Sequence, residues 1–203
     1  MPKLVAITVV LLGFCGSGIA QKNEFAVVLG AKITPSVDSA TVDTTFAFEA
    51  NYAHQLARVP ALALHLEFPV AATPSANFST ATLTNAVSYS TVFFTPSLRL
   101  KFGAPGASTA VWISGGGGLA HFNPSSSGAC VAALGLVCPP TPSSTTKGAV
   151  QGGAGLDYHP GLMPFAFRVE ARDFYTGIPN LGVFPAVKIR NNILVGAGVV
   201  FRF

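Results

Sequence analysis

The chain ends in the stretch NNILVGAGVVFRF, residues 191–203, and this stretch decides the expected fold. Successive side chains of a β-strand point to opposite faces. One face of the stretch is wholly apolar and comprises Ile193, Val195, Ala197, Val199, Phe201 and Phe203. The other face comprises Asn192, Gly196, Gly198 and Arg202 with Leu194 and Val200. The pattern predicts a strand with one apolar face that runs to the last residue.

Two classes of protein contain such a strand. One is a soluble β-sandwich, although an apolar strand at a chain terminus is prone to fraying and to edge pairing in water. The other is a transmembrane β-barrel, whose outward-facing side chains lie in lipid. Alternation alone does not separate the two classes.

The composition favours the membrane class. Half of the residues are hydrophobic, the mean hydropathy is +0.52, and 10% of the residues are charged, against about 25% in ordinary globular domains. A membrane-spanning helix needs about 20 consecutive apolar residues. The whole chain contains 21 Gly and 15 Pro, and outside the N-terminus these two residue types interrupt the apolar runs. A chain this apolar enters a membrane without helices only by closing a sheet, because unpaired backbone groups in lipid cost several kcal/mol each.

The N-terminus predicts export. Residues 1–3 (MPK) give a short positive region, residues 4–14 an apolar core, and residues 18–20 (GIA) a small-x-small cleavage site. We therefore expect a signal peptide at 1–20 and a single barrel domain at 21–203. Cys15 gives only a weak lipoprotein pattern, because the bulky Phe14 precedes it. The formal net charge of +4 is too small to indicate nucleic-acid binding.

Two further cysteines, Cys130 and Cys138, lie close together in a stretch rich in Ser, Pro and Gly. In an exported protein such a pair predicts a disulfide. The sequence has no His or additional Cys nearby at ligand spacing, so we expect no metal site there.

Eight segments have the alternation and length of membrane strands. They are residues 24–34, 44–54, 60–69, 89–102, 109–122, 147–158, 164–175 and 191–203. Short connectors alternate with long ones at 35–43, 70–88, 123–146 and 176–190. Short periplasmic turns and long external loops are typical of transmembrane barrels. Pro96 within the fourth segment predicts a bulge or a shorter strand, and Gly115–Gly118 leave the facing of Trp112 and Ile113 open.

The faces opposite the apolar ones carry small residues and charges of both signs, as a narrow lumen requires. The seventh segment places Arg168, Glu170 and Arg172 on one face. Paired charges are tolerated where a lone charge is costly. We therefore predict a lumen charge network of Glu49, Glu67, Arg99, Lys101, Asp157, Arg168, Glu170 and Arg172, with Arg202 as a further partner. It acts either as a plug that fills the barrel, which we favour for eight strands, or as a gate or selectivity ring.

These features together resemble the small bacterial outer-membrane β-barrel family, which includes the membrane domain of outer-membrane protein A. The resemblance implies an eight-stranded antiparallel up-and-down barrel with surface loops. It also implies contact with outer-membrane lipid and lipopolysaccharide, and an assembly signal at Phe201 and Phe203 that the barrel-assembly machinery reads. No peptidoglycan-binding domain is appended, so a cell-wall tether is not expected.

Three functions are compatible with these patterns. We favour a structural or surface-interaction barrel, monomeric, with an unidentified loop ligand and without cofactor, metal or catalytic residues. A narrow pore for ions or small solutes is the alternative. A membrane-embedded lipid-modifying enzyme is the third, but it needs a nucleophile with a positioned base. Only His121 lies suitably, near residues 125–127 (SSS), and it has no evident carboxylate partner.

Overall fold

The computed structural model describes residues 22–35, 40–80, 87–104, 107–124, 143–161, 163–176 and 191–203. These residues form ten β-strands. Their bounds are β1 Asn23–Ile33, β2 Ala40–Val42, β3 Thr45–Val59, β4 Leu62–Thr80, β5 Val87–Phe94, β6 Ser97–Phe102, β7 Thr109–Pro124, β8 Thr145–Tyr158, β9 Phe165–Thr176 and β10 Asn191–Arg202. In the described part of the chain, no helix is long and apolar enough to cross a membrane.

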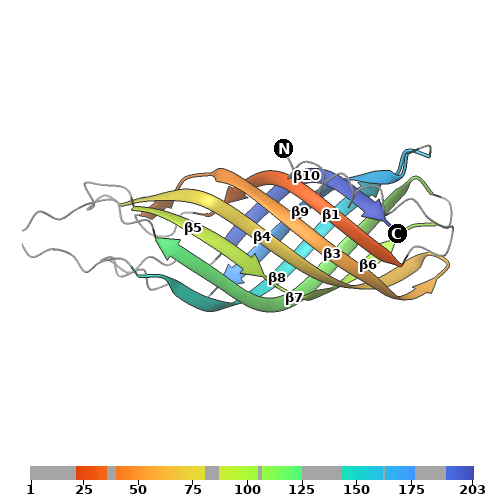
Figure 1. Cartoon of the computed structure of the whole chain (residues 1–203), viewed down its shortest axis with the longest axis horizontal. Helices are drawn as coiled ribbons and strands as arrows, with labels where there is room; N and C mark the ends of the chain where they lie inside the picture. Colours follow the sequence, from red (N-terminus) through yellow and green to blue (C-terminus); the bar gives the residue numbers. More distant parts are fainter. Residues whose placement is uncertain are drawn as a thin grey trace, which may run out of the picture.

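The strands close into a barrel (Figure 1). Each principal strand pairs antiparallel with its neighbours in the order β1, β3, β4, β5 with β6, β7, β8, β9 and β10, and β10 pairs again with β1. β5 and β6 pair with the same two neighbours, β4 and β7, so together they make one stave, meaning one full-length strand of the barrel wall. β2 is a short extra strand beside β4. The barrel therefore has eight staves. The predicted eight-stranded antiparallel barrel is confirmed.

The two ends of the barrel differ. At one end, here called the terminal end, Asn23 and Phe203 exchange two backbone hydrogen bonds of 2.9 and 3.0 Å. The short connections that join β3 to β4, β6 to β7 and β8 to β9 lie at this end (Figure 1). The opposite end, here called the loop end, is where β4, β7 and β9 finish.

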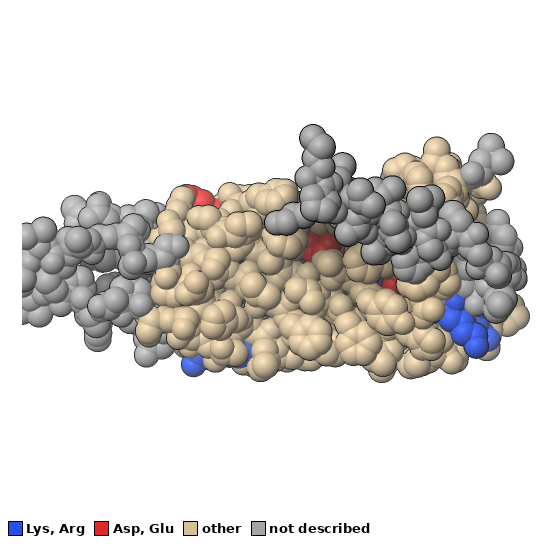
Figure 2. All heavy atoms as spheres, in the orientation of Figure 1, with Lys and Arg blue, Asp and Glu red and all other residues tan. Residues whose placement is uncertain are grey.

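The distribution of polarity is the reverse of that in a soluble protein. Large apolar side chains such as Leu29, Val150 and Val169 are more than half exposed, whereas Arg168 and Arg172 are each 1% exposed. In Figure 2 most of the described surface between the two ends is uncharged, and a few acidic atoms are visible near its middle. An outward apolar wall around a polar interior is what a barrel in lipid requires.

One predicted connector is wrong. We expected a long loop at 70–88, but β4 continues to Thr80 and β5 begins at Val87. The continuation pairs with β5 and β2, so its backbone groups are satisfied by neighbours that local sequence does not reveal. Pro74 lies where the pairing of β4 with β5 shifts register, between Thr73 and Ala76. A proline is tolerated at such an irregularity.

The fourth stave is interrupted at Thr95 and Pro96, which separate β5 from β6. This is the shortening that Pro96 predicted. On the adjacent β7, a Cβ at Gly116 would overlap the Pro96 carbonyl oxygen, and a Cβ at Gly118 would overlap that of Phe94. The two glycines therefore allow β7 to pass close to the break.

The structure also settles the facing of β7. Trp112 points into the lumen and is 1% exposed, whereas Ile113 faces outward.

Candidate functional site

The interior of the barrel holds ten ionisable side chains that we call the lumen network. Five are carboxylates, from Glu24, Glu49, Glu67, Asp157 and Glu170, and five are bases, from Arg99, Lys101, Arg168, Arg172 and Arg202. They come from β1, β3, β4, β6, β8, β9 and β10. Strand parity places each of them on an inward face. The formal charges of the ten side chains cancel.

The part of the network toward the terminal end is built on Glu24 and Asp157. Arg168 donates from Nε and Nη2 to the two Asp157 oxygens at 2.7 and 3.1 Å. Lys101 Nζ bridges the two carboxylates at 2.8 Å to Glu24 and 2.5 Å to Asp157. Arg99 also binds Glu24, and Arg202 Nε lies 3.2 Å from it. Each carboxylate is thus held by several bases, the geometry that buried charges require.

The part in the middle of the lumen is built on Arg172. Its guanidinium lies 3.1 Å from Glu49, 2.8 Å from Glu67 and 3.2 Å from Glu170. Asn51 and Ser97 donate hydrogen bonds to Glu67 at 3.1 and 2.8 Å. The two parts are joined by longer contacts from Arg99 to Glu67 at 3.5 Å and from Arg168 to Glu170 at 3.9 Å.

Trp112 lies among the guanidinium groups. The carbon centres of Arg99, Arg168 and Arg172 lie 5.6, 5.0 and 5.0 Å from its ring centroid, within the range of cation–π attraction. A Cβ at Gly155 on the neighbouring β8 would lie 2.5 Å from a carbon of this ring. The absence of a side chain at Gly155 therefore makes room for the indole.

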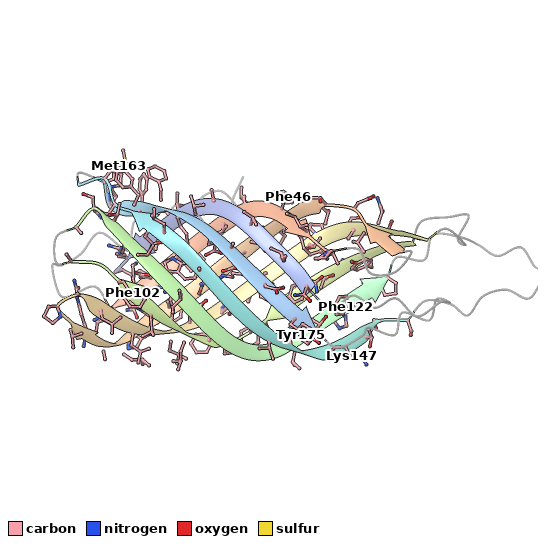
Figure 3. All side chains as sticks on the ribbon, turned by 180° about the vertical axis from the view of Figure 1, so that it is seen from behind. Phe46, Phe102, Phe122, Lys147, Met163 and Tyr175 are labelled. Atoms are coloured by element: carbon pink, nitrogen blue, oxygen red, sulfur yellow. The ribbon has the colours of Figure 1, made fainter. Side chains whose placement is uncertain are left out.

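An aromatic cluster fills the lumen toward the loop end. It consists of Tyr89, Phe93, Phe122 and Phe174 with small and aliphatic neighbours. Phe93 stacks on Phe174 with ring centroids 4.6 Å apart and meets Phe122 edge-on at 6.3 Å. Figure 3 shows Phe122 near the loop end, with Tyr175 nearby and Phe102 toward the terminal end. The lumen thus holds a charged layer and an apolar layer.

Lys32 adjoins the aromatic cluster. Its ammonium lies 5.0 Å from the centroid of the Tyr89 ring, and the residue is 1% exposed. Among the described residues, the ammonium has no hydrogen-bond partner.

The structure brings all eight of the predicted charges, and Arg202, into the lumen network. Sequence reasoning missed Glu24 and Trp112. Glu24 shares its strand face with Ala26 and Val28, opposite the outward Phe25, so strand parity could have identified it. Nothing in the sequence specified the facing of Trp112, because the glycines beside it fit either face.

The remaining predicted residues lie elsewhere. Cys130 and Cys138 are outside the described residues, as is the predicted signal peptide. Phe201 lies on the wall with its ring centroid 6.2 Å from that of Phe165. His121 faces outward, and its Nδ1 lies 2.9 Å from the Thr146 hydroxyl. Within the described part of the chain, no group of three or more His, Cys, Asp or Glu residues could hold a metal ion.

Comparison with known proteins identifies the fold but no sequence relative. No family model matches the chain, and no curated protein matches it. Among solved structures, OprG of Pseudomonas aeruginosa is similar with a TM-score of 0.56 at 14% identity, over 90% of this chain and 97% of that one. Ail, the attachment invasion locus protein of Yersinia pestis, was solved with the heparin analogue sucrose octasulfate and is similar with a TM-score of 0.55 at 12% identity, over 91% of this chain and 100% of that one.

A third similar structure is Neisserial surface protein A, with a TM-score of 0.50 at 14% identity, over 89% of this chain and 96% of that one. At these identities the likeness establishes the architecture alone. The chain has the fold of the small transmembrane β-barrels of bacterial outer membranes.

Proposed function

We propose that this chain, a small transmembrane β-barrel, serves in the bacterial outer membrane as a closed structural or surface-interaction protein. The observation that carries the proposal is the filled lumen. The lumen network and the aromatic cluster occupy successive layers of the barrel. An eight-stranded barrel is just wide enough for its inward side chains, so the two layers leave little room for solutes to pass.

The interactions of such a protein lie in its loops. Loops presented on a rigid scaffold commonly carry binding function, and the long connectors predicted at 123–146 and 176–190 fit that role. Outer-membrane lipid and lipopolysaccharide would contact the apolar wall and its outer rim. Phe201 and Phe203 would be read by the barrel-assembly machinery, and the barrel would act as a monomer. The signal peptide at 1–20 remains part of this proposal.

We propose no enzymatic activity. His121 and Thr146 are hydrogen-bonded to each other on the outer face of adjacent strands. Among the described residues, no carboxylate hydrogen-bonds to this histidine to orient it as a general base.

Conductance measurements test the proposal. Residues 21–203, refolded and inserted into planar bilayers, should give no steady single-channel current in 1 M KCl. The control is Arg172→Ala, which removes the base that holds three carboxylates and should open intermittent conductance. Steady conductance of the unmodified barrel would instead support the narrow-pore alternative.

A further inference from the structure

The terminal end of the lumen contains a cavity of about 350 Å³. Glu24, Lys101 and Asp157 of the lumen network line it, together with Arg58, His65 and Arg202. The volume is in the range of small-molecule sites. This cavity plays no part in the closed-barrel proposal, because the layers beyond it toward the loop end are filled.

The charge of the network is unevenly distributed along the barrel. The part toward the terminal end pairs four bases, Arg99, Lys101, Arg168 and Arg202, with two carboxylates, a formal charge of 4 − 2 = +2. The middle part pairs Arg172 with three carboxylates, a formal charge of 1 − 3 = −2. The positive part is the one beside the cavity. Arg58 adds another positive charge to the cavity lining.

The two carboxylates that line the cavity already form ion pairs with several bases. Glu24 is contacted by Arg99, Lys101, Arg168 and Arg202, and Asp157 is contacted by three of the same bases. A cation that entered the cavity would therefore meet neutralised acids. An anion would meet N–H donors that are not all used in these ion pairs. A guanidinium carries five N–H groups, and the Arg202 side chain, which contacts the two carboxylates, remains 26% exposed.

A buried polar atom beside the cavity lacks a partner. His65 lines the cavity and is 3% exposed. Its Nδ1 makes no hydrogen bond with any of the described residues. Most buried side-chain polar atoms in folded proteins are hydrogen-bonded, to protein groups or to ordered water. The unpartnered imidazole nitrogen is consistent with a ligand or water in the cavity.

We propose that this cavity binds a phosphate group, either as the free ion or as a small phosphomonoester. Arg58, Arg202 and Lys101 would neutralise its charge, and His65 would hydrogen-bond to one of its oxygens. Guanidinium groups match phosphate oxygens in charge and in geometry. The volume exceeds that of the ion alone, and Gln55, Ser108 and Thr109 give the lining polar groups that fit a small hydroxylated body.

Isothermal titration calorimetry on the refolded barrel of residues 21–203 in detergent tests this proposal. Three probes are used in separate titrations: inorganic phosphate, glycerol 3-phosphate and glycerol. Saturable heat is expected for both phosphates and none for glycerol. Tighter binding of glycerol 3-phosphate would identify the ester as the better occupant, and equal or weaker binding would identify the free ion.

Substitutions locate the site. Arg58→Gln should weaken phosphate binding about 1.5- to 5-fold, the range for loss of one exposed charge contact. Lys147→Gln removes the same charge at the loop end (Figure 3) and should leave affinity unchanged. Arg58 makes no contact with the lumen network, so its variant should still fold.

Two results would overturn the proposal. One is the absence of saturable heat with either phosphate. The other is an equal loss of affinity in Arg58→Gln and Lys147→Gln, which would indicate diffuse attraction to a basic protein. Neither result bears on conductance, so the closed-barrel proposal is tested separately.

Discussion

At the scale of single residues, this protein depends on buried charges that are each held by several partners. Arg168 shows the pattern, with two hydrogen bonds to Asp157 and longer contacts to Glu24 and Glu170. Removal of one partner leaves the others buried and uncompensated, which costs more than the pair itself contributes. The network is therefore sensitive to single substitutions.

Arg168→Leu should destabilise the barrel by about 3–5 kcal/mol, because Asp157 loses its two-point partner in the interior. Urea unfolding of the protein in lipid vesicles measures the change. Arg58→Leu is the control, since Arg58 lies outside the network, and it should change stability little. A more stable Arg168→Leu barrel would mean that the residue faces lipid.

Lys32 is the opposite case. It is buried against the Tyr89 ring, and no carboxylate in the described part of the chain contacts its ammonium. Burial of an unpaired charge is unfavourable, so Lys32→Met should stabilise the barrel by about 1 kcal/mol or more. The same urea assay reports it. A destabilised variant would indicate that residues outside the described ranges supply a partner.

At the scale of strands, a glycine leaves space into which a side chain of the neighbouring strand can pack. On β8, Gly155 faces inward against Trp112 and the Val169 carbonyl, whereas Gly152 on the same strand has no heavy atom within 4 Å of where its Cβ would be. Strand parity puts the two glycines on opposite faces, but the sequence does not show which side chain lies beside each of them. Their neighbours make one indispensable and the other replaceable.

Gly155→Ala should therefore destabilise the barrel by about 1–3 kcal/mol, because the added methyl overlaps a buried ring that three guanidinium groups surround. Gly152→Ala should be nearly neutral. Tryptophan fluorescence during unfolding follows both variants through Trp112, the single Trp of the chain. Equal stabilities of the two variants would show that the indole does not pack against Gly155.

The connector between β7 and β8 gives a second prediction at this scale. If Cys130 and Cys138 form a disulfide, the mature protein should show no free thiol without reductant. Cys130→Ser should leave the barrel assembled while making the connector easier to cleave by protease, since a short disulfide loop contributes about 2–3 kcal/mol of local constraint. Thiol titration and limited proteolysis measure the two effects. Loss of assembly in the variant would contradict the prediction.

At the scale of the whole molecule, closure of β1 on β10 removes every exposed sheet edge from the eight staves. A closed barrel resists unfolding by detergent, because no free edge is available from which the pairing can open. Unboiled protein should therefore migrate differently from boiled protein on a detergent gel. Identical migration, or recovery of the protein in the soluble periplasmic fraction, would contradict a membrane barrel.

The sequence by itself determined the class of fold and the facing of most strands. The period-two alternation of apolar and polar residues, as in Arg168, Glu170 and Arg172, is a local signal that fixes which face meets lipid. The same parity was sufficient to identify nearly every charge of the lumen. The facing of a residue can be predicted locally, because it depends only on the alternation of residues within its own strand.

Only the tertiary structure decided which residues meet across the lumen. The pairing of Arg172 with Glu49 and Glu67, and the place of Trp112 among three guanidinium groups, depend on barrel closure and register. The extension of β4 to Thr80 likewise depends on partners supplied by β2 and β5. Contacts between distant strands follow from how the sheet closes, and no local pattern encodes them.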